Sequence, residues 1–159
     1  MRIIIHDLES NDLLELNKDD IVICNKSNGN CMGCFNCWVK TPFECTIKDS
    51  IKNNGKTLLD SDELIIISKC INGSYSYKVK TILERSISYV EPFFTLRNNE
   101  IHHKARTDKK LNFKVFFYGD DISEIDKKTA TKLVLANQKN LNTKDPEIYF
   151  INNIKEIKI

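Results

Sequence analysis

Four cysteines in one short segment carry the most distinctive chemistry of this sequence. Residues 31–49 read Cys-Met-Gly-Cys-Phe-Asn-Cys-Trp-Val-Lys-Thr-Pro-Phe-Glu-Cys-Thr-Ile-Lys-Asp. Two residues separate Cys31 from Cys34, two more separate Cys34 from Cys37, and Cys45 follows after a turn. A run with this spacing can curl around a cubane iron–sulfur cluster and present three thiolates to three irons. Cys45 could then supply the fourth ligand.

The same thiols allow other interpretations. Zinc sites more often use cysteine pairs split by a longer spacer, so zinc is the weaker metal hypothesis. Cysteine is also among the most buried residue types, and these side chains could pack without any metal. They could form a labile disulfide or act as redox-sensitive thiols. Cys24 and Cys70 lie in or beside predicted strands, and we interpret them first as core residues.

Length and composition fit a single domain over residues 1–159. The chain is 41% hydrophobic and has a net charge of +2, which is too near neutral to indicate a nucleic-acid or membrane surface. Its N-terminal apolar run is too short for a signal peptide, and no stretch approaches the roughly 20 residues that span a bilayer. We therefore expect a cytoplasmic protein whose cysteines are reduced thiols, metal ligands or redox centres.

Alternating apolar runs and helical stripes predict an α/β fold. The predicted strands are Arg2–Asp7, Asp20–Cys24, Glu63–Ser68, Asn112–Tyr118 and Glu147–Ile151. The third run is unbroken and mostly β-branched, which is typical of a parallel strand buried on both faces. Strands that alternate with helices favour a five-stranded parallel sheet in a three-layer sandwich, in the doubly wound, flavodoxin-like arrangement.

Three helices are predicted between the later strands. An apolar stripe predicts the first of them up to Pro92, and its members are Val79, Ile82, Leu83, Ile87 and Val90. Ser123 and Asp126 resemble a capping box that begins a helix reaching Leu141, and Asp49–Asp60 is a weaker helix. Between the first two strands, Leu8–Asp19 is near the minimum for a crossover, so we expect a shortened or missing first helix.

The cysteine motif resembles that of the NADPH-dependent FMN reductase and iron–sulfur flavoprotein group. The resemblance runs from Cys31-x-x-Cys34-x-x-Cys37-Trp38 through Lys40-Thr41-Pro42 to Cys45-x-x-x-Asp49. It continues in Ile65–Tyr75, Lys80, Glu84-Arg85, His102-His103-Lys104-x-Arg106 and Tyr118-Gly119. It therefore covers most of the chain from about Asp20 onward.

The resemblance implies a flavodoxin-like redox protein. Members hold FMN at the C-terminal edge of the sheet, with the phosphate after the first strand and the ring near the loop after the third. Iron–sulfur flavoproteins bind a four-iron cluster through a compact cysteine motif, here Cys31, Cys34, Cys37 and Cys45. Dimers are common, so we expect a homodimer or a pair with a related flavodoxin-like subunit. NAD(P)H or ferredoxin would donate the electrons.

The segment after the first strand departs from this group. A phosphate site needs free backbone N–H groups and hydroxyl donors, helped by a helix N-terminus. Residues 6–12 read His-Asp-Leu-Glu-Ser-Asn-Asp, with three acids and no glycine. Coulomb repulsion and missing donors both oppose a phosphate, so we expect the usual FMN phosphate site to be absent.

The loop after the third strand keeps features of a flavin-ring site. Our candidate cofactor-binding residues there are Cys70, Asn72, Gly73, Ser74 and Tyr75. Glycine allows close backbone approach, the polar side chains can bond a ring edge, and a tyrosine can stack. The equally good alternative is an ordinary turn with a helix N-cap at Ser74 or Ser76.

Other candidates are weaker. His102–Arg106 with Lys109 and Lys110 predicts a basic loop, either a solvated connection or a grip on a phosphate. We expect Arg85 to pair with a carboxylate or to bond loop carbonyls, and Trp38 either to shield a cluster or to fill the core.

Three functions remain open from the sequence. The first is an electron-transfer protein with a flavin or a cluster, the second a non-catalytic flavodoxin-like subunit that has lost FMN binding. The third is a thiol redox sensor.

Overall fold

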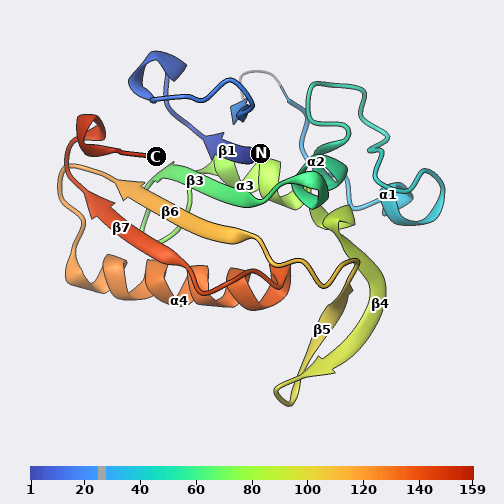
Figure 1. Ribbon diagram of the computed structural model, residues 1–159. Coiled ribbons are helices and arrows are strands. Elements are labelled where there is room, and N and C mark those ends of the chain that lie inside the picture. Colours follow the sequence, from blue (N-terminus) through green and yellow to red (C-terminus); the bar gives the residue numbers. More distant parts are fainter. Residues whose placement is uncertain (25–27) are drawn as a thin grey trace.

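The computed structural model describes residues 1–24 and 28–159, and it shows an α/β fold built on a five-stranded parallel sheet (Figure 1). The strand order is β2-β1-β3-β6-β7. Their bounds are β1 (Arg2–His6), β2 (Ile21–Cys24), β3 (Glu63–Lys69), β6 (Asn112–Tyr118) and β7 (Glu147–Ile151). All five predicted strands are confirmed to within one residue at each end.

The isoleucine runs of β1 and β3 form the centre of the sheet. Successive side chains of a strand point to opposite faces, so a run that is apolar at every position fills two cores at once. Ile3 and Ile66 belong to the core on one face, and Ile4 and Ile65 belong to the core on the other. All four are fully buried.

The described α-helices pack on one face of this sheet. They are α1 (Asn36–Val39), α2 (Asn54–Asp60), α3 (Tyr77–Glu84) and α4 (Glu124–Leu141). Each contributes an apolar side chain to the same core, namely Trp38, Leu58, Val79 and Val134 in that order. The expectation of helices on both faces, as in a three-layer sandwich, was therefore wrong.

Short non-helical segments cover the opposite face. Leu8 and Leu14 reach it from the connection between β1 and β2, and Ile157 reaches it from the C-terminal segment. The only regular structure in these covers is the 3₁₀ turn η1 (Asn11–Leu13) and the 3₁₀ turn η3 (Ile154–Glu156). The predicted loss of the first helix is confirmed for the described residues, and it explains why this face lacks a helical layer.

The helix predicted from the apolar stripe of Val79 to Val90 is shorter than that stripe. Helix α3 begins at its N-cap Ser76 and stops after Glu84, and a 3₁₀ turn, η2 (Ile87–Tyr89), follows. The predicted extension to Val90 was wrong, because Arg85 turns away to bond loop residues described below. For α4 the capping box is confirmed, since Ser123 Oγ accepts a hydrogen bond from the Asp126 N–H at 3.1 Å.

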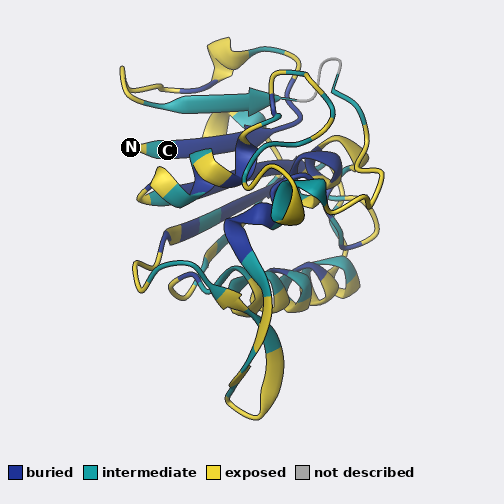
Figure 2. Ribbon diagram, turned by 90° about the vertical axis from the view of Figure 1, so that its right-hand side faces the viewer, coloured by how far each residue is buried: buried dark blue, intermediate teal, exposed yellow. Residues whose placement is uncertain are grey.

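A β-hairpin that the sequence did not predict follows η2. It pairs β4 (Val90–Arg97) with β5 (Glu100–Ala105) and projects from the body, where most of it is exposed (Figures 1 and 2). Asn98 and Asn99 have φ of 49° and 64°, as the two-residue turns that match strand twist require. The basic loop predicted at His102–Arg106 is therefore mostly strand. None of the described helices has the length and apolar character needed to cross a membrane.

Candidate functional site

The four cysteines of the predicted cluster line one small cavity. Cys31, Cys34, Cys37 and Cys45 share it with a mostly apolar surround, which includes Met32, Phe35, Ile47, Arg85 and Ile87. All six cysteines of the chain are free thiols, and Cys24 and Cys70 lie outside this cavity. The four cysteines of the motif therefore border one common space.

Local backbone geometry orients the first three thiols. Phe35 adopts a left-handed conformation with φ of 54°, and helix α1 begins directly after it. This bend separates Cys34, which is exposed, from Cys37, which lies half-buried on α1. The backbone N–H of Cys45 donates to the Lys52 carbonyl at 2.7 Å, which holds the fourth thiol against the others.

The environments of two thiols differ. Hydrogen bonds from the Asn36 backbone and then from the Thr46 hydroxyl lower the pKa of Cys34. Burial, followed by repulsion from Cys45 and Cys31, raises the pKa of Cys37. Repulsion among neighbouring thiolates is itself a sign of their proximity, and a bound cation would relieve it.

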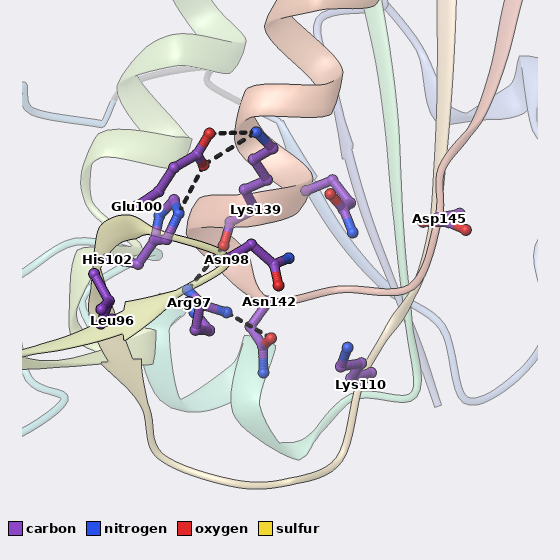
Figure 3. A pocket seen from close by; sticks show the side chains of 10 residues that line it. Leu96, Arg97, Asn98, Glu100, His102, Lys110, Lys139, Asn142 and Asp145 are labelled. Atoms are coloured by element: carbon purple, nitrogen blue, oxygen red, sulfur yellow. Dashed lines mark hydrogen bonds and ion pairs between the residues drawn. The ribbon is translucent and has the colours of Figure 1, made fainter.

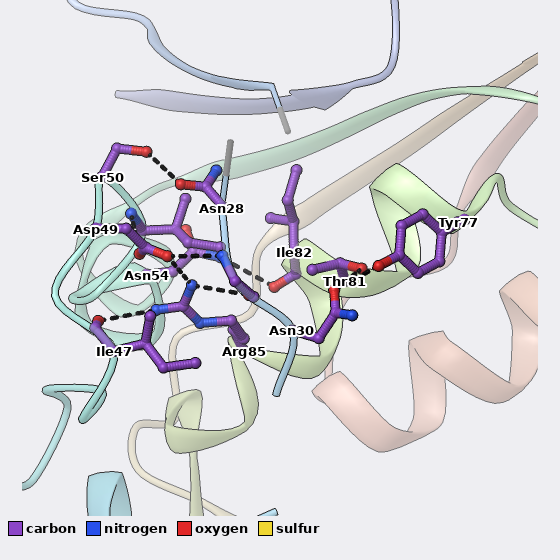
Figure 4. Close-up of polar contacts among 12 residues, drawn as sticks. Asn28, Asn30, Ile47, Asp49, Ser50, Asn54, Tyr77, Thr81, Ile82 and Arg85 are labelled. Carbon is purple, nitrogen blue, oxygen red and sulfur yellow. Dashed lines mark hydrogen bonds and ion pairs between the residues drawn. The ribbon is translucent and has the colours of Figure 1, made fainter. Parts of the chain in front are cut away.

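Arg85 holds both ends of the cysteine segment (Figure 4). Its guanidinium donates to the Gly29 carbonyl at 3.1 Å, to the Ile47 carbonyl at 3.1 Å and to the Asp49 carboxylate. The Arg85 side chain is fully buried. The expectation that Arg85 pairs with a carboxylate and bonds loop carbonyls is confirmed.

This arginine also brings a positive charge to the thiols. Burial alone would lower the pKa of Arg85, but its hydrogen bonds to Asp49 and to Cys45 outweigh burial and raise it. Burial alone would raise the pKa of Asp49, but the bonds from Arg85 and from the Gly29 N–H outweigh it and lower it. The guanidinium Nε has no partner among the described residues. One buried donor of the residue that lines the cysteine cavity is therefore unsatisfied within the described part of the chain.

The four thiols are not arranged around a single metal ion. No three His, Cys, Asp or Glu side chains within residues 1–24 and 28–159 stand close enough to hold one metal ion. A cubane cluster instead spreads its cysteine ligands over four irons. The cavity itself encloses about 20 Å³, close to the space of one water molecule. The exposed Cys31 and Cys34 would have to turn to admit a cluster.

Asp7 lies at the C-terminal edge of the sheet, directly after β1. Its carboxylate accepts the Lys69 backbone N–H at 3.0 Å and the Tyr118 hydroxyl at 3.0 Å. Both donors are thus already bound to an internal anion. The expected absence of an FMN phosphate site after the first strand stays a prediction.

The loop after β3 is a tight turn that docks on helix α4. Asn72 and Gly73 have φ of 50° and 71°, and Ile71 and Ser74 bond each other's backbone across the turn. A Cβ at Gly73 would lie 2.6 Å from Thr129 Cβ, so this glycine permits close approach to the protein itself. The loop therefore has a structural role at this position.

The other residues predicted to contact a flavin ring lie mostly inward. Tyr75 is buried, stacks on Phe117 with ring centroids 5.2 Å apart and accepts a bond from Asn137. Cys70 packs against the core, and burial raises its pKa. Of the two tyrosines beside this loop, only Tyr77 is exposed, and it lines an open cleft of about 710 Å³ with Asp7.

Trp38 fills the core edge and does not line the cysteine cavity. Its indole N–H donates to the Val90 carbonyl at 2.8 Å, and its ring stacks on Phe35. Phe35, which sequence reasoning did not single out, is the aromatic residue at the cavity. Its position in the sequence between Cys34 and Cys37 was the feature that could have identified it.

Searches against models of known protein families and against curated proteins found no match to this chain.

Proposed function

We propose that this chain is a flavodoxin-like redox protein related in function to iron–sulfur flavoproteins. Counted along the parallel sheet alone, the order β2-β1-β3-β6-β7 corresponds to 2-1-3-4-5, the order of flavodoxin-like folds. The change of direction lies between β1 and β3, where such folds place their ligands. The topology and the cysteine motif support the same kind of protein independently.

The single observation that carries the proposal is the convergence of four thiols on one cavity. Cys31, Cys34, Cys37 and Cys45 are the proposed ligands of a four-iron, four-sulfide cluster. Such a cluster, when bound, supplies one-electron transfer at a potential set by its surroundings. No other grouping of thiols in the described part of the chain offers four of these soft ligands.

The surrounding residues would tune this site. Arg85 places a buried positive charge at the cavity that the four thiols line. Phe35 and Ile87 limit access of water from the apolar side of the cavity. Thr46 lies 3.8 Å from Cys34 Sγ and can donate a hydrogen bond to sulfur, a contact that raises reduction potentials.

The proposed flow of electrons does not require FMN on this chain. Because Asp7 already accepts the Lys69 N–H and the Tyr118 hydroxyl at this edge of the sheet, we assign the flavin to a partner, either a related flavodoxin-like subunit or a donor protein. The donor classes are NAD(P)H, acting through such a partner, and ferredoxin. Reduced cysteines fit a cytoplasmic location.

Anaerobic purification followed by visible spectroscopy tests this proposal. We expect a broad absorption that bleaches on reduction, about four irons per chain and no released FMN. Cys34→Ser and Cys45→Ser should lose the absorption, whereas Cys24→Ser, outside the cavity, should retain it. Protein that stays colourless and iron-free after reconstitution with iron and sulfide would overturn the cluster.

A thiol redox sensor is the second candidate, favoured by the contrast between two neighbouring cysteines. Cys34 is exposed and Cys37, three residues later, is half-buried, an arrangement that suits an attacking and a resolving thiol. Hydrogen peroxide would then convert the two thiols into one disulfide and be reduced to water. Mass spectrometry should detect loss of two hydrogens in wild type and none in Cys37→Ser.

A further inference from the structure

The buried guanidinium of Arg85 has one donor that the described part of the chain does not use. Its Nη1 group donates to the Gly29 carbonyl and to Asp49, and its Nη2 group donates to the Ile47 carbonyl (Figure 4). The Nε–H is buried and has no partner among the described residues. Buried N–H groups of native proteins nearly always have a partner, and an exception calls for an explanation such as a ligand or a redox role.

Arg85 is also the cation of the cysteine cavity. Of the four arginines in the chain, it alone is among the described residues that line the cavity, and no lysine or histidine is among them. Glu84 is the acid among them. A cluster bound by four thiolates has a net negative charge, and a buried anion needs a compensating cation and hydrogen bonds. Arg85 can supply both.

Arg97 has the same pattern of hydrogen bonds but different surroundings. Its Nη groups donate to the Asn142 side chain and to the Lys139 carbonyl, and its Nε–H also has no partner among the described residues. Figure 3 shows polar side chains around it, with Glu100 and Lys139 bonded to each other. Arg97 is half-buried, whereas Arg85 lies fully buried at a cavity lined mostly by thiols and apolar side chains.

We propose that the Arg85 Nε–H donates a hydrogen bond to a sulfur atom of the bound cluster, and that Arg85 thereby raises the reduction potential of this site. This inference rests on the proposed redox function and adds a role for one residue of this chain. A hydrogen bond to sulfur stabilises the reduced cluster, which has one more negative charge, and so makes its reduction easier. The three Nη bonds hold the guanidinium in place for this contact.

A purely structural role for Arg85 makes a different prediction, and Arg106 provides the matched case. Arg106 lies over the Phe43 ring of the cysteine segment, 4.6 Å from the ring centroid, and its Nε donates to the Ser88 carbonyl at 2.9 Å. It is not among the described residues that line the cavity. Arg106→Lys therefore loosens the cysteine segment without removing a donor from the cavity.

Pulsed electron paramagnetic resonance of protein labelled with ¹⁵N-arginine tests this role. The cluster is reconstituted with iron and sulfide and reduced with dithionite, and the spectra then detect ¹⁵N nuclei that are hydrogen-bonded to cluster sulfur. We expect a ¹⁵N coupling in wild type and in Arg106→Lys, and its loss in Arg85→Lys. In redox titrations the reduction potential should fall in Arg85→Lys and stay at the wild-type value in Arg106→Lys.

The labelled wild type decides the assignment even where Arg85→Lys does not fold. A reduced cluster without a ¹⁵N-arginine coupling would overturn the role of Arg85 and leave the proposed function in place. A coupling and a potential that Arg85→Lys leaves unchanged would do the same. A wild type that takes up no cluster would instead overturn the proposed function, and this role of Arg85 with it.

Discussion

The Tyr118 hydroxyl donates a 3.0 Å hydrogen bond to Asp7 Oδ1, and this bond joins the ends of two strands that are not neighbours in the sheet. Strand β3 lies between them, and Asp7 also accepts the Lys69 N–H at its end. Asp7 therefore ties three parallel strands together at the C-terminal edge of the sheet.

Removing either partner of this contact should destabilise the fold. We expect Asp7→Ala to lower the free energy of unfolding by about 2–3 kcal/mol, because it leaves two donors unsatisfied. Tyr118→Phe should lower it by about 1 kcal/mol. Urea titrations of both variants and the double variant should show a coupling of at least about 0.5 kcal/mol. Strictly additive losses would mean that the two groups do not interact.

Breaking the Arg85–Asp49 pair should have a larger effect. Arg85→Leu leaves the Asp49 carboxylate partly buried without its cation, so we expect a loss of about 3–5 kcal/mol in urea unfolding. Lys56→Met, which removes an exposed pair with Asp60, is the control and should change stability by less than about 1 kcal/mol. Equal effects would contradict the structural role assigned to Arg85.

Asp62 should titrate far below an ordinary aspartate. Hydrogen bonds from Lys109 and from the N-terminal ammonium lower its pKa to about 2. Because the folded-state pKa lies below the unfolded value, this group adds stability above pH 4 or so, and that stability is lost as pH falls toward 2. Carboxyl ¹³C NMR should show the low pKa, and Lys109→Met should raise it. An unchanged titration in that variant would remove the assigned cause.

Ile157 should matter to stability although it lies outside every helix and strand. It is buried against the face of the sheet that has no helices. Ile157→Ala should cost about 2–5 kcal/mol in urea unfolding, as other large-to-small changes in cores do. Ile125→Ala, at an exposed isoleucine, should change stability by no more than about 0.5 kcal/mol. Similar values for both would show that the C-terminal segment does not hold the sheet.

The strands could be predicted because their physical cause is local. The run from Leu64 to Ile67 has no polar side chain, and only a strand buried on both faces places such a run without exposing it. The loss of the first helix followed from chain length alone. The side of the sheet on which the helices pack could not be read from these patterns, since it depends on which crossover helices exist.

The hairpin β4–β5 was missed because its apolar side chains face solvent, whereas the apolar side chains of a strand usually face the core. The Asn98-Asn99 pair was a turn signal, and Phe94 alternates with Leu96. Yet Ile87 and Val90 continued the helical stripe of α3, and Pro92 read as the end of that helix. Helix α3 ends sooner because the Arg85 guanidinium donates hydrogen bonds to the carbonyls of Gly29 and Ile47. No local sequence pattern reveals these contacts.

The site was predictable in its thiols and not in their surroundings. The motif grouped Cys31, Cys34 and Cys37 with Cys45, and all four line one cavity. The buried guanidinium beside them comes from a distant part of the chain. Whether these thiols hold a cluster stays a prediction.

The face of the sheet opposite the helices has a consequence for biosynthesis. Its two covers come from segments far apart in sequence, around Leu8 and around Ile157, and the second follows all five strands. In a growing chain β1, β3 and β6 are therefore made well before Ile157, which closes the core on this face. Until then Ile4, Ile65 and Phe116 stay partly open to solvent, a nascent-chain stage at which a chaperone would have its natural binding surface.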